Sequence, residues 1–198
     1  MQPSIAALVL AAGSGTRMGR LKQLLPLGDR PVLRHVIDAL QDAGVGEIAV
    51  VCGADPSIYQ QAVAGSSARL VPNPNEESEM ADSLRIGLGQ LAAGASGVLV
   101  CLADHPLVHA GTCRLLIDKH RLLPDTIVVP AFRGRRGHPA LFPAGVIREI
   151  FTRHSLRDVV REDPGRVLTV DVGDEGVVLD MDTEGDYRKA VELYRTRA

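Results

Sequence analysis

Residues 8–27 of the chain read LVLAAGSGTRMGRLKQLLPL, an apolar run that leads into a loop with three glycines. Gly13, Gly15 and Gly19 have the spacing G-x-G-x-x-x-G, one residue longer than the dinucleotide-binding fingerprint. No G-K-[ST] follows, so the Walker phosphate loop is excluded as well. Glycines in such a loop let backbone N–H groups approach an anion closely. A buried strand followed by this loop is typical of an α/β fold that binds a phosphorylated ligand.

The same loop carries two cations, Arg17 and Lys22. A dinucleotide fold neutralises a pyrophosphate bridge largely with a helix N-terminus, whereas a triphosphate carries more charge and is better stabilised by basic side chains. A glycine-rich turn with solvated basic residues would have the same sequence, so the loop alone leaves both interpretations open. We expect Lys22 to be an exposed loop cation that contributes little to stability.

Short apolar runs with strand character alternate with longer helical patterns along the chain. Strands are expected at 4–12, 46–53, 68–75, 97–104 and 125–132, one or two more within 166–181, and an edge or hairpin strand at the end of 133–142. Helices are expected at 31–44, 55–64, 80–94, 110–123, 144–151, 155–163 and 183–197. This order predicts βαβ units and a three-layer α/β fold, in which a mostly parallel sheet has helices on both faces. No linker separates two halves, so residues 1–198 are predicted to form a single domain.

The composition excludes several classes of protein. Hydrophobic residues make up 45% of the chain and charged residues 23%, as is usual for a globular protein. Aromatic residues make up only 3%, and the net charge is −2, which argues against a general binder of nucleic acids or anionic membranes. No apolar stretch reaches the roughly 20 residues of a membrane helix. We therefore expect a local anion site, with no nucleic-acid partner and no membrane association.

The start of the chain and its cysteines both favour the cytoplasm. Residues 1–15, MQPSIAALVLAAGSG, lack the positively charged n-region of a signal peptide. Cys52, Cys101 and Cys113 are odd in number and form no C-x-x-C pattern, which predicts reduced thiols and argues against cysteine-bound zinc. A cytoplasmic location is the resulting prediction.

Asp104 directly follows the most apolar strand-like run, in VLVCLADHPLV at 98–108. Pro106 ends the strand ladder just after it. A carboxylate in this position suits a hard cation such as Mg²⁺, which prefers oxygen ligands. Asp104 could equally cap the next turn or helix, and its own position does not decide between the two roles.

Asp180 and Asp182 stand on alternate residues in VVLDMDTEGDY at 177–187. In an extended segment this spacing puts both carboxylates on one face. Ligands of parallel sheets bind beyond the carboxyl ends of the strands, so we expect the glycine loop, Asp104 and this segment to converge there. One of the pair is a candidate second metal ligand, and Asp182 could instead cap the following helix.

Arginines are concentrated in FRGRRGHPALF at 132–142, which contains Arg133, Arg135, Arg136 and His138. Guanidinium groups match the geometry of phosphate, so this loop is a candidate clamp for an anionic acceptor. A solvated basic loop is the alternative. Between glycine and proline, His138 is expected to position a group or donate a hydrogen bond rather than act as a general base.

These motifs together resemble a known family. LAAGSGTRMGRLKQLLPLGDRPVL resembles the signature L-A-[AG]-G-x-x-x-R-M-G-x-x-K of the molybdenum cofactor nucleotidyltransferases, and EMADSLRIGL, CLADHPLV, RGHPALF and LDMDTEGDY resemble further segments of that family. Ala12 in LAAG resembles the cytidylyltransferase branch, since the guanylyltransferase branch tends to read LAGG. Glu79 before Met80, and ADHP at 103–106, depart from the GM and GDQP of that branch and leave the identity of the acceptor open.

The resemblance implies a Rossmann-like nucleotidyltransferase fold and a reaction. An acceptor phosphate would attack the α-phosphorus of CTP in the presence of Mg²⁺ and release pyrophosphate. Molybdopterin would be the acceptor, and a molybdenum hydroxylase or its chaperone a further partner. The residues implied for nucleotide binding are Leu10, Ala11, Ala12, Gly13, Gly15, Arg17, Lys22, Asn73 and Ser83; those for catalysis are Arg17, Lys22 and Asp104; those for the metal are Asp104 and Asp182; and those for the acceptor are Arg133, Arg136 and His138.

Two other functions fit the same residues. The enzyme could transfer a nucleotide to a different acceptor, such as a sugar or alcohol phosphate. Alternatively, the fold could bind and deliver molybdopterin without turnover. The combination of Arg17, Lys22 and Asp104 favours an enzyme, because a carrier has no need to neutralise a pyrophosphate leaving group.

Overall fold

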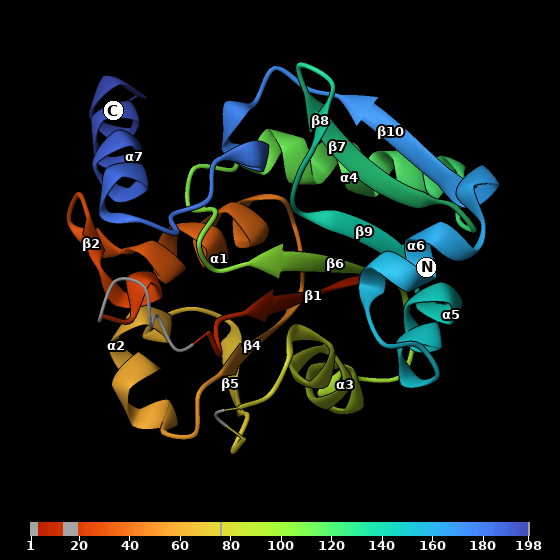
Figure 1. Ribbon diagram of the computed structural model, residues 1–198, viewed down its shortest axis with the longest axis horizontal. Helices are drawn as coiled ribbons and strands as arrows, with labels where there is room; N and C mark the ends of the chain where they lie inside the picture. Colours follow the sequence, from red (N-terminus) through yellow and green to blue (C-terminus); the bar gives the residue numbers. More distant parts are fainter. Residues whose placement is uncertain (1–3, 14–19, 76, 198) are drawn as a thin grey trace.

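The computed structural model describes residues 4–13, 20–75 and 77–197, and these form the predicted three-layer α/β fold (Figure 1). Its strands are β1 (Ser4–Leu10), β2 (Pro26–Leu27), β3 (Arg30–Pro31), β4 (Glu47–Cys52), β5 (Ala68–Pro72), β6 (Ala95–Leu102), β7 (Ile127–Phe132), β8 (Arg135–Arg136), β9 (Ala140–Pro143) and β10 (Val167–Asp171). The central sheet has the order β10-β7-β9-β6-β1-β4-β5, and β8 pairs with β7. β1 runs parallel to both β4 and β6, β4 parallel to β5, and β7 parallel to β10, so the sheet is mostly parallel.

The helices cover both faces of this sheet. They are α1 (Val32–Asp42), α2 (Gln60–Val63), α3 (Met80–Gln90), α4 (Ala110–Leu122), α5 (Ala144–Ile147), α6 (Leu156–Glu162) and α7 (Glu184–Arg197). Short 3-10 helices are η1 (Lys22–Leu24), η2 (Pro56–Tyr59), η3 (Arg148–Phe151), η4 (Pro164–Arg166) and η5 (Glu175–Val178). Within the described part of the chain, no helix has both the length and the apolar character needed to cross a bilayer.

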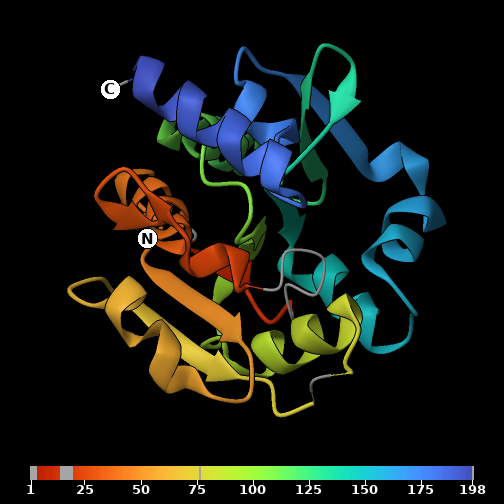
Figure 2. The ribbon, with the colours of Figure 1, turned by 60° about the vertical axis from the view of Figure 1, so that its left-hand side comes forward.

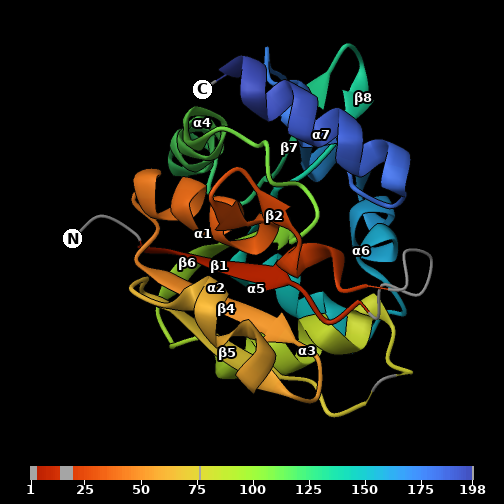
Figure 3. The same ribbon diagram turned by 90° about the vertical axis from the view of Figure 1, so that its left-hand side faces the viewer.

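The alternating directions of the side chains along β1 explain why helices pack on both faces of the sheet. Ala7 and Val9 belong to the core beneath α1 and α4, whereas Leu8 points to the core beneath α3, α5 and α6. Successive side chains of a strand face opposite sides of a sheet, so a wholly apolar strand needs cover on each face. Figure 3 shows β1 running across the view, with α1 and α4 on one side of the sheet and α3 and α5 on the other.

The strand at the end of 133–142 lies inside the sheet, which corrects the edge alternative, whereas its antiparallel pairing with β7 agrees with the hairpin alternative. β9 pairs antiparallel with β6 through residues 140–143 and with β7 through Leu141. All four residues of β9 are buried. The chain therefore turns back after β7 and inserts one antiparallel strand between β7 and β6. The arginines before β9 suggested a surface segment, but the apolar residues that follow them complete the core.

The segment after β10 is fixed against the segment that follows β6. Only one strand forms within 166–181, and η5 takes the place of a second. Asp174, which is 3% exposed, accepts hydrogen bonds from the backbone N–H of His109 at 2.9 Å and the hydroxyl of Thr112 at 2.7 Å. Gly176 approaches Leu107 so closely that a Cβ at position 176 would lie 2.2 Å from the Leu107 carbonyl oxygen. η5, which leads toward Asp180 and Asp182, is thereby held beside the end of β6.

Replacement of Gly176 by alanine should destabilise the fold, because the added methyl group meets backbone that cannot rotate away. Overpacking of this kind costs about 1–3 kcal/mol or more. For a chain of this size, each kcal/mol lowers the melting temperature by roughly 2–4 °C. Thermal unfolding followed by circular dichroism measures the shift. Gly89→Ala on α3 is the matched control, because its Cβ meets open space and the substitution favours a helix. Equal melting temperatures for the two variants would contradict the close approach of η5.

Candidate active site

Three segments that are distant in sequence meet at the edge where β1 and β6 end (Figure 2). The loop after β1, the end of β6 and the segment before α7 form an open cleft of about 430 Å³ together with the first turn of α3. The expected convergence is therefore present. The cleft is lined by Leu10, Ala11, Ala12, Gly13, Lys22, Gln23, Ser78, Glu79, Met80, Ser83, Leu102, Ala103, Asp104, Asp180 and Asp182.

Lys22 joins two carboxylates in this cleft. Its Nζ donates to Asp104 Oδ2 at 2.5 Å and to Asp182 Oδ1 at 2.6 Å. The side chains of Lys22 and Asp104 are only 18% and 15% exposed, and that of Asp182 is 41% exposed. The expectation that Lys22 is an exposed cation is therefore wrong. The neighbouring residues Leu25 and Leu27 are buried, and this anchoring turns Lys22 toward the cleft.

The charge of Lys22 is kept by its partners. Burial alone would lower the pKa of Lys22, but the hydrogen bonds and charges of Asp104 and Asp182 outweigh this effect and raise the pKa above its ordinary value. Lys22 is therefore an ammonium ion at neutral pH. The described cleft nonetheless contains one lysine against four carboxylates, since Glu79 and Asp180 also line it. Counted over the described residues, which do not include Arg17, negative charge is therefore in excess in the cleft.

Asp182 is available to Lys22 because another residue caps α7. The Thr183 hydroxyl accepts a hydrogen bond from the backbone N–H of Asp186 at 3.2 Å, and the Asp186 carboxylate accepts one from the Thr183 N–H at 2.9 Å. Thr183 and Asp186 therefore cap α7, and Asp182 is not the capping residue. Leu179 and Met181 are buried on the opposite face, so Asp180 and Asp182 share the face that lines the cleft.

Asp104 has one carboxylate oxygen that fits a metal ion. Its Oδ1 is buried and accepts no hydrogen bond from any described residue, while Oδ2 is bonded to Lys22. His105 Nε2 lies 3.8 Å from Oδ1. A buried, unpartnered carboxylate oxygen is costly, and a bound cation would remove that cost. One or two carboxylates, with waters and phosphate oxygens, are the usual ligands of Mg²⁺, so Asp104 and Asp182 fit this ion.

The predicted nucleotide-binding residues occupy different places. Leu10, Ala11, Ala12, Gly13 and Ser83 line the cleft. Gly15 and Arg17 lie outside the described residues, so their roles stay predictions.

Asn73 lies behind the wall of the cleft rather than in it. It is 1% exposed, and its Nδ2 donates to the hydroxyls of Ser78 at 2.7 Å and Ser83 at 3.0 Å. This arrangement assigns Asn73 a positioning role for those two serines, and direct contact between Asn73 and a nucleotide stays a prediction.

The predicted acceptor residues are not part of the cleft lining. Arg133 and Arg136 are exposed on the β7–β8 hairpin, where Arg133 stacks on Phe132 at 5.1 Å and Arg136 Nε donates to Thr169 at 3.0 Å. His138 lies beside His105, with ring centroids 5.5 Å apart. The structure therefore groups His138 with Asp104 through His105, but it leaves the two arginines on the surface.

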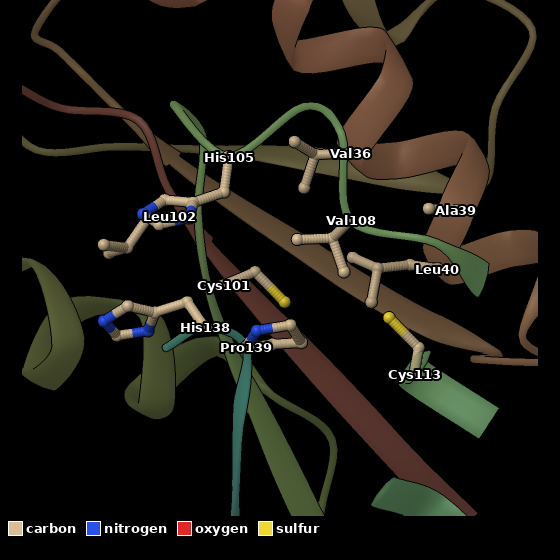
Figure 4. A pocket seen from close by; sticks show the side chains of 10 residues that line it. All are labelled: Val36, Ala39, Leu40, Cys101, Leu102, His105, Val108, Cys113, His138 and Pro139. Carbon is tan, nitrogen blue, oxygen red and sulfur yellow. The ribbon is translucent and has the colours of Figure 1, made fainter. Parts of the chain in front are cut away.

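A small apolar cavity of about 10 Å³ lies next to these histidines (Figure 4). Figure 4 shows His105 and His138 on one side of it and the sulfurs of Cys101 and Cys113 on the other. Burial, and secondarily the neighbouring His105, lower the pKa of His138 to about 4. His138 is therefore neutral at physiological pH and cannot supply a positive charge to an acceptor phosphate. This cavity is too small and too apolar for a substrate.

Some residues of the cleft were not predicted as site residues. Gln23, Ser78, Glu79 and Met80 line it, and of these only Glu79 and Met80 had been noted, as a departure from the family's segment. Gln23 stands next to Lys22, and Met80 is 54% exposed in spite of its apolar side chain. The exposure of Met80 is a feature of the structure, so the sequence offered no clue to it beyond the position of the residue in EMADSLRIGL.

The comparison with known families decides the class of protein. A model of the MobA-like NTP transferase domain matches residues 7–167, which include every predicted site residue except the Asp180 and Asp182 pair. The chain belongs to this family. Nucleotidyltransferase chemistry is the activity of the MobA-like family, and the cleft with Lys22 and its carboxylates is its candidate active site here.

Relatives of this MobA-like protein cover nearly its whole length. The nicotine blue oxidoreductase of Paenarthrobacter nicotinovorans is 30% identical, over 91% of this chain and 93% of its own. A nucleotidyl transferase from Methanothermobacter superposes with a TM-score of 0.85 at 25% identity, covering 98% of this chain and 99% of that one. Rv0371c of Mycobacterium tuberculosis H37Rv, in complex with manganese, is 30% identical with a TM-score of 0.74, covering 97% and 100%. The chain spans only about a third of the bifunctional GlmU of Clavibacter sepedonicus, at 34% of its length.

Lys22→Met should lower both stability and turnover. The variant keeps most of the aliphatic stem but leaves Asp104 and Asp182 without their shared counter-ion. We expect triphosphate turnover to fall by about 100-fold or more, as for other residues that stabilise developing charge. We also expect a melting temperature a few degrees lower at neutral pH, because an unpaired, partly buried carboxylate is destabilising. Lys189→Met is the matched control, since Lys189 pairs with Glu175 on the exposed surface. Unchanged turnover in Lys22→Met would exclude the assigned role.

Proposed function

We propose that this MobA-like protein is a Mg²⁺-dependent cytidylyltransferase of the cytoplasm, which transfers CMP from CTP to the phosphate of molybdopterin and releases pyrophosphate. The observation that carries the proposal is the ammonium of Lys22 held between Asp104 and Asp182 at the end of two parallel strands. A binding module needs no such costly grouping of charges, whereas phosphoryl chemistry requires charges fixed before the reaction. The molybdopterin acceptor, and delivery to a molybdenum hydroxylase or its chaperone, rest on the sequence motifs.

The proposed reaction needs little from the protein beyond position and charge. An acceptor phosphate is already anionic, so it can attack the α-phosphorus without a strong base and without a covalent intermediate. Lys22 would stabilise charge on the reacting phosphate, and Arg17 would hold the β- and γ-phosphates as pyrophosphate leaves. The backbone of residues 10–13 and Ser83 would hold the nucleotide.

Asp104 and Asp182 would hold the metal ion. When bound, Mg²⁺ would neutralise phosphate oxygens that the four carboxylates of the cleft otherwise repel. Asp104 Oδ1 is the oxygen with no hydrogen-bond partner among the described residues, so it is the first candidate ligand. The manganese complex of Rv0371c supports a divalent cation in a related fold.

A pyrophosphate-release screen tests the proposal. Each of CTP, GTP, UTP and ATP is incubated with Mg²⁺ and molybdopterin, a sugar phosphate or an alcohol phosphate. We expect the fastest release with CTP and molybdopterin. Faster release with a different acceptor would favour the alternative transferase, and equal rates with CTP and GTP would remove the base assignment while sparing the reaction.

A second arm of the screen addresses a redox function. Reduction of nicotine blue is measured because the relative named nicotine blue oxidoreductase matches 91% of this chain. Reduction without any pyrophosphate release would overturn the transferase proposal. Binding of molybdopterin without either activity would favour the delivery module.

Asp104→Asn should weaken the metal dependence. The substitution preserves size but removes the negative charge and replaces one oxygen with a donor that cannot bind a cation. We expect the Mg²⁺ concentration for half-maximal triphosphate binding to rise by about 10-fold or more. Calorimetric titration of CTP at several Mg²⁺ concentrations measures this shift. Asp118→Asn on the exposed surface of α4 is the control, and identical Mg²⁺ curves for Asp104→Asn and the wild type would rule out Asp104 as a ligand.

A further inference from the structure

Gln23 is a buried amide that the proposed reaction leaves without a role. It is 2% exposed, and its Nε2 donates to the Ala11 carbonyl oxygen at 2.7 Å and to the Tyr59 hydroxyl at 3.1 Å. The Gly13 carbonyl oxygen lies 3.4 Å from the same nitrogen. Carbonyl oxygens only accept hydrogen bonds, so the NH₂ end of the amide must face the loop. Gln23 therefore ties the turn that carries Lys22 to the loop after β1.

Tyr59 contacts the same carbonyl oxygen and lies beside the Gln23 amide. It lies at the end of η2, is 1% exposed, and its hydroxyl donates to Ala11 at 3.3 Å. Burial raises the pKa of Tyr59, so the hydroxyl remains a protonated donor. The Ala11 carbonyl oxygen thus receives two hydrogen bonds from side chains of two different segments.

This double contact sets the direction of the next backbone N–H. In a trans peptide the C=O and the N–H point in opposite directions. The C=O of Ala11 points to Gln23 and Tyr59 in the interior, so the N–H of Ala12 in the same peptide points away from them. Ala12 lines the cleft, and no described residue accepts a hydrogen bond from its N–H.

We infer that Gln23 and Tyr59 are positioning residues, which fix the 11–12 peptide so that the Ala12 N–H donates to an acceptor atom of the bound nucleoside triphosphate. The inference rests on the proposed function. Rotation of this peptide would instead turn the Ala11 C=O toward the cleft and repel the same acceptor atom. The two buried side chains prevent this rotation. They therefore keep the loop, before the nucleotide binds, in the form whose N–H can donate to a hydrogen-bond acceptor of the nucleotide.

The arrangement also links the two halves of the site. Gln23 follows Lys22 directly, so the turn that presents the ammonium to Asp104 and Asp182 is the turn that holds the loop. A shift of η1 would move both the cation and the Ala12 N–H. The nucleotide-binding backbone and the charged centre therefore form one positioned unit.

Two variants remove the proposed contacts with little change of shape. Gln23→Met replaces the amide donors with an apolar chain of similar length, and Tyr59→Phe removes one hydroxyl. We expect KM for CTP to rise about 10-fold in Gln23→Met and about threefold in Tyr59→Phe. We expect kcat to change less than about threefold, because Asp104 and Asp182 still hold Lys22 and the lost contact acts in binding. Gln90→Met makes the same substitution at an exposed position on α3 and should leave both constants unchanged.

Backbone NMR reads the Ala12 N–H directly. The sequence contains only three Ala–Ala peptides, at 6–7, 11–12 and 92–93, so protein labelled with ¹³C,¹⁵N-alanine gives three inter-residue signals. The 11–12 signal is the one lost in Ala12→Gly. We expect CTP with Mg²⁺, without acceptor, to shift this signal in the wild type and to shift it far less in Gln23→Met. Cytidine and inorganic tripolyphosphate are added separately to show whether the base or the phosphates supply the acceptor atom.

The outcomes separate this inference from the proposed function. If calorimetry shows that the wild type binds no nucleoside triphosphate, both are overturned. If the wild type binds CTP while the 11–12 signal does not respond, or responds equally in Gln23→Met, only the positioning role is overturned. A lower melting temperature in Gln23→Met with an unchanged KM would likewise reduce Gln23 to a structural residue.

Discussion

The arrangement of the site depends on one ammonium ion shared by two carboxylates from opposite parts of the chain. Lys22 is 82 residues from Asp104 and 160 from Asp182. Two like charges about 4 Å apart repel by about 4 kcal/mol near a protein surface, so the carboxylates cannot be brought together without a cation. Because this repulsion opposes the approach of Asp182 to Asp104, the segment before α7 also needs contacts outside the charged centre. Asp174 and Gly176 hold η5 beside the end of β6, independently of the charged centre.

Most of the fold was predictable because its signals are local or periodic. An apolar strand such as β6 followed by Asp104 indicates a parallel sheet whose carboxyl edge carries the site, and the structure has this arrangement. The position of β9 was not predictable from its own residues. Ala140–Pro143 are equally apolar at an edge or in the interior, and only pairing with two distant strands decides between them.

The site was predictable by residue type but not by contact. Glycines, cations and carboxylates marked the loop after β1, Asp104 and Asp182, yet the exposure of Lys22 was misjudged because burial depends on partners far along the chain. Asn73 was also chosen by residue type, and its two hydrogen bonds to Ser78 and Ser83 place it behind the wall of the cleft. Its contact with a nucleotide stays a prediction. Gln23 carried no pattern at all, since its importance comes from the backbone oxygens that it faces.

Charge then distinguishes catalysis from simple anion binding in this cleft. A site that only stores an anion is stable when positive groups are in excess, as at a helix N-terminus or a cluster of arginines. Here the described lining has four carboxylates and one lysine, and the exposed arginines of the β7–β8 hairpin lie outside it. Counted over the described residues, negative charge is therefore in excess, and a cation that enters with a polyphosphate would strengthen its binding. This excess agrees with the proposed metal-dependent reaction, in which Arg17, outside the described residues, is a further cation for the phosphates.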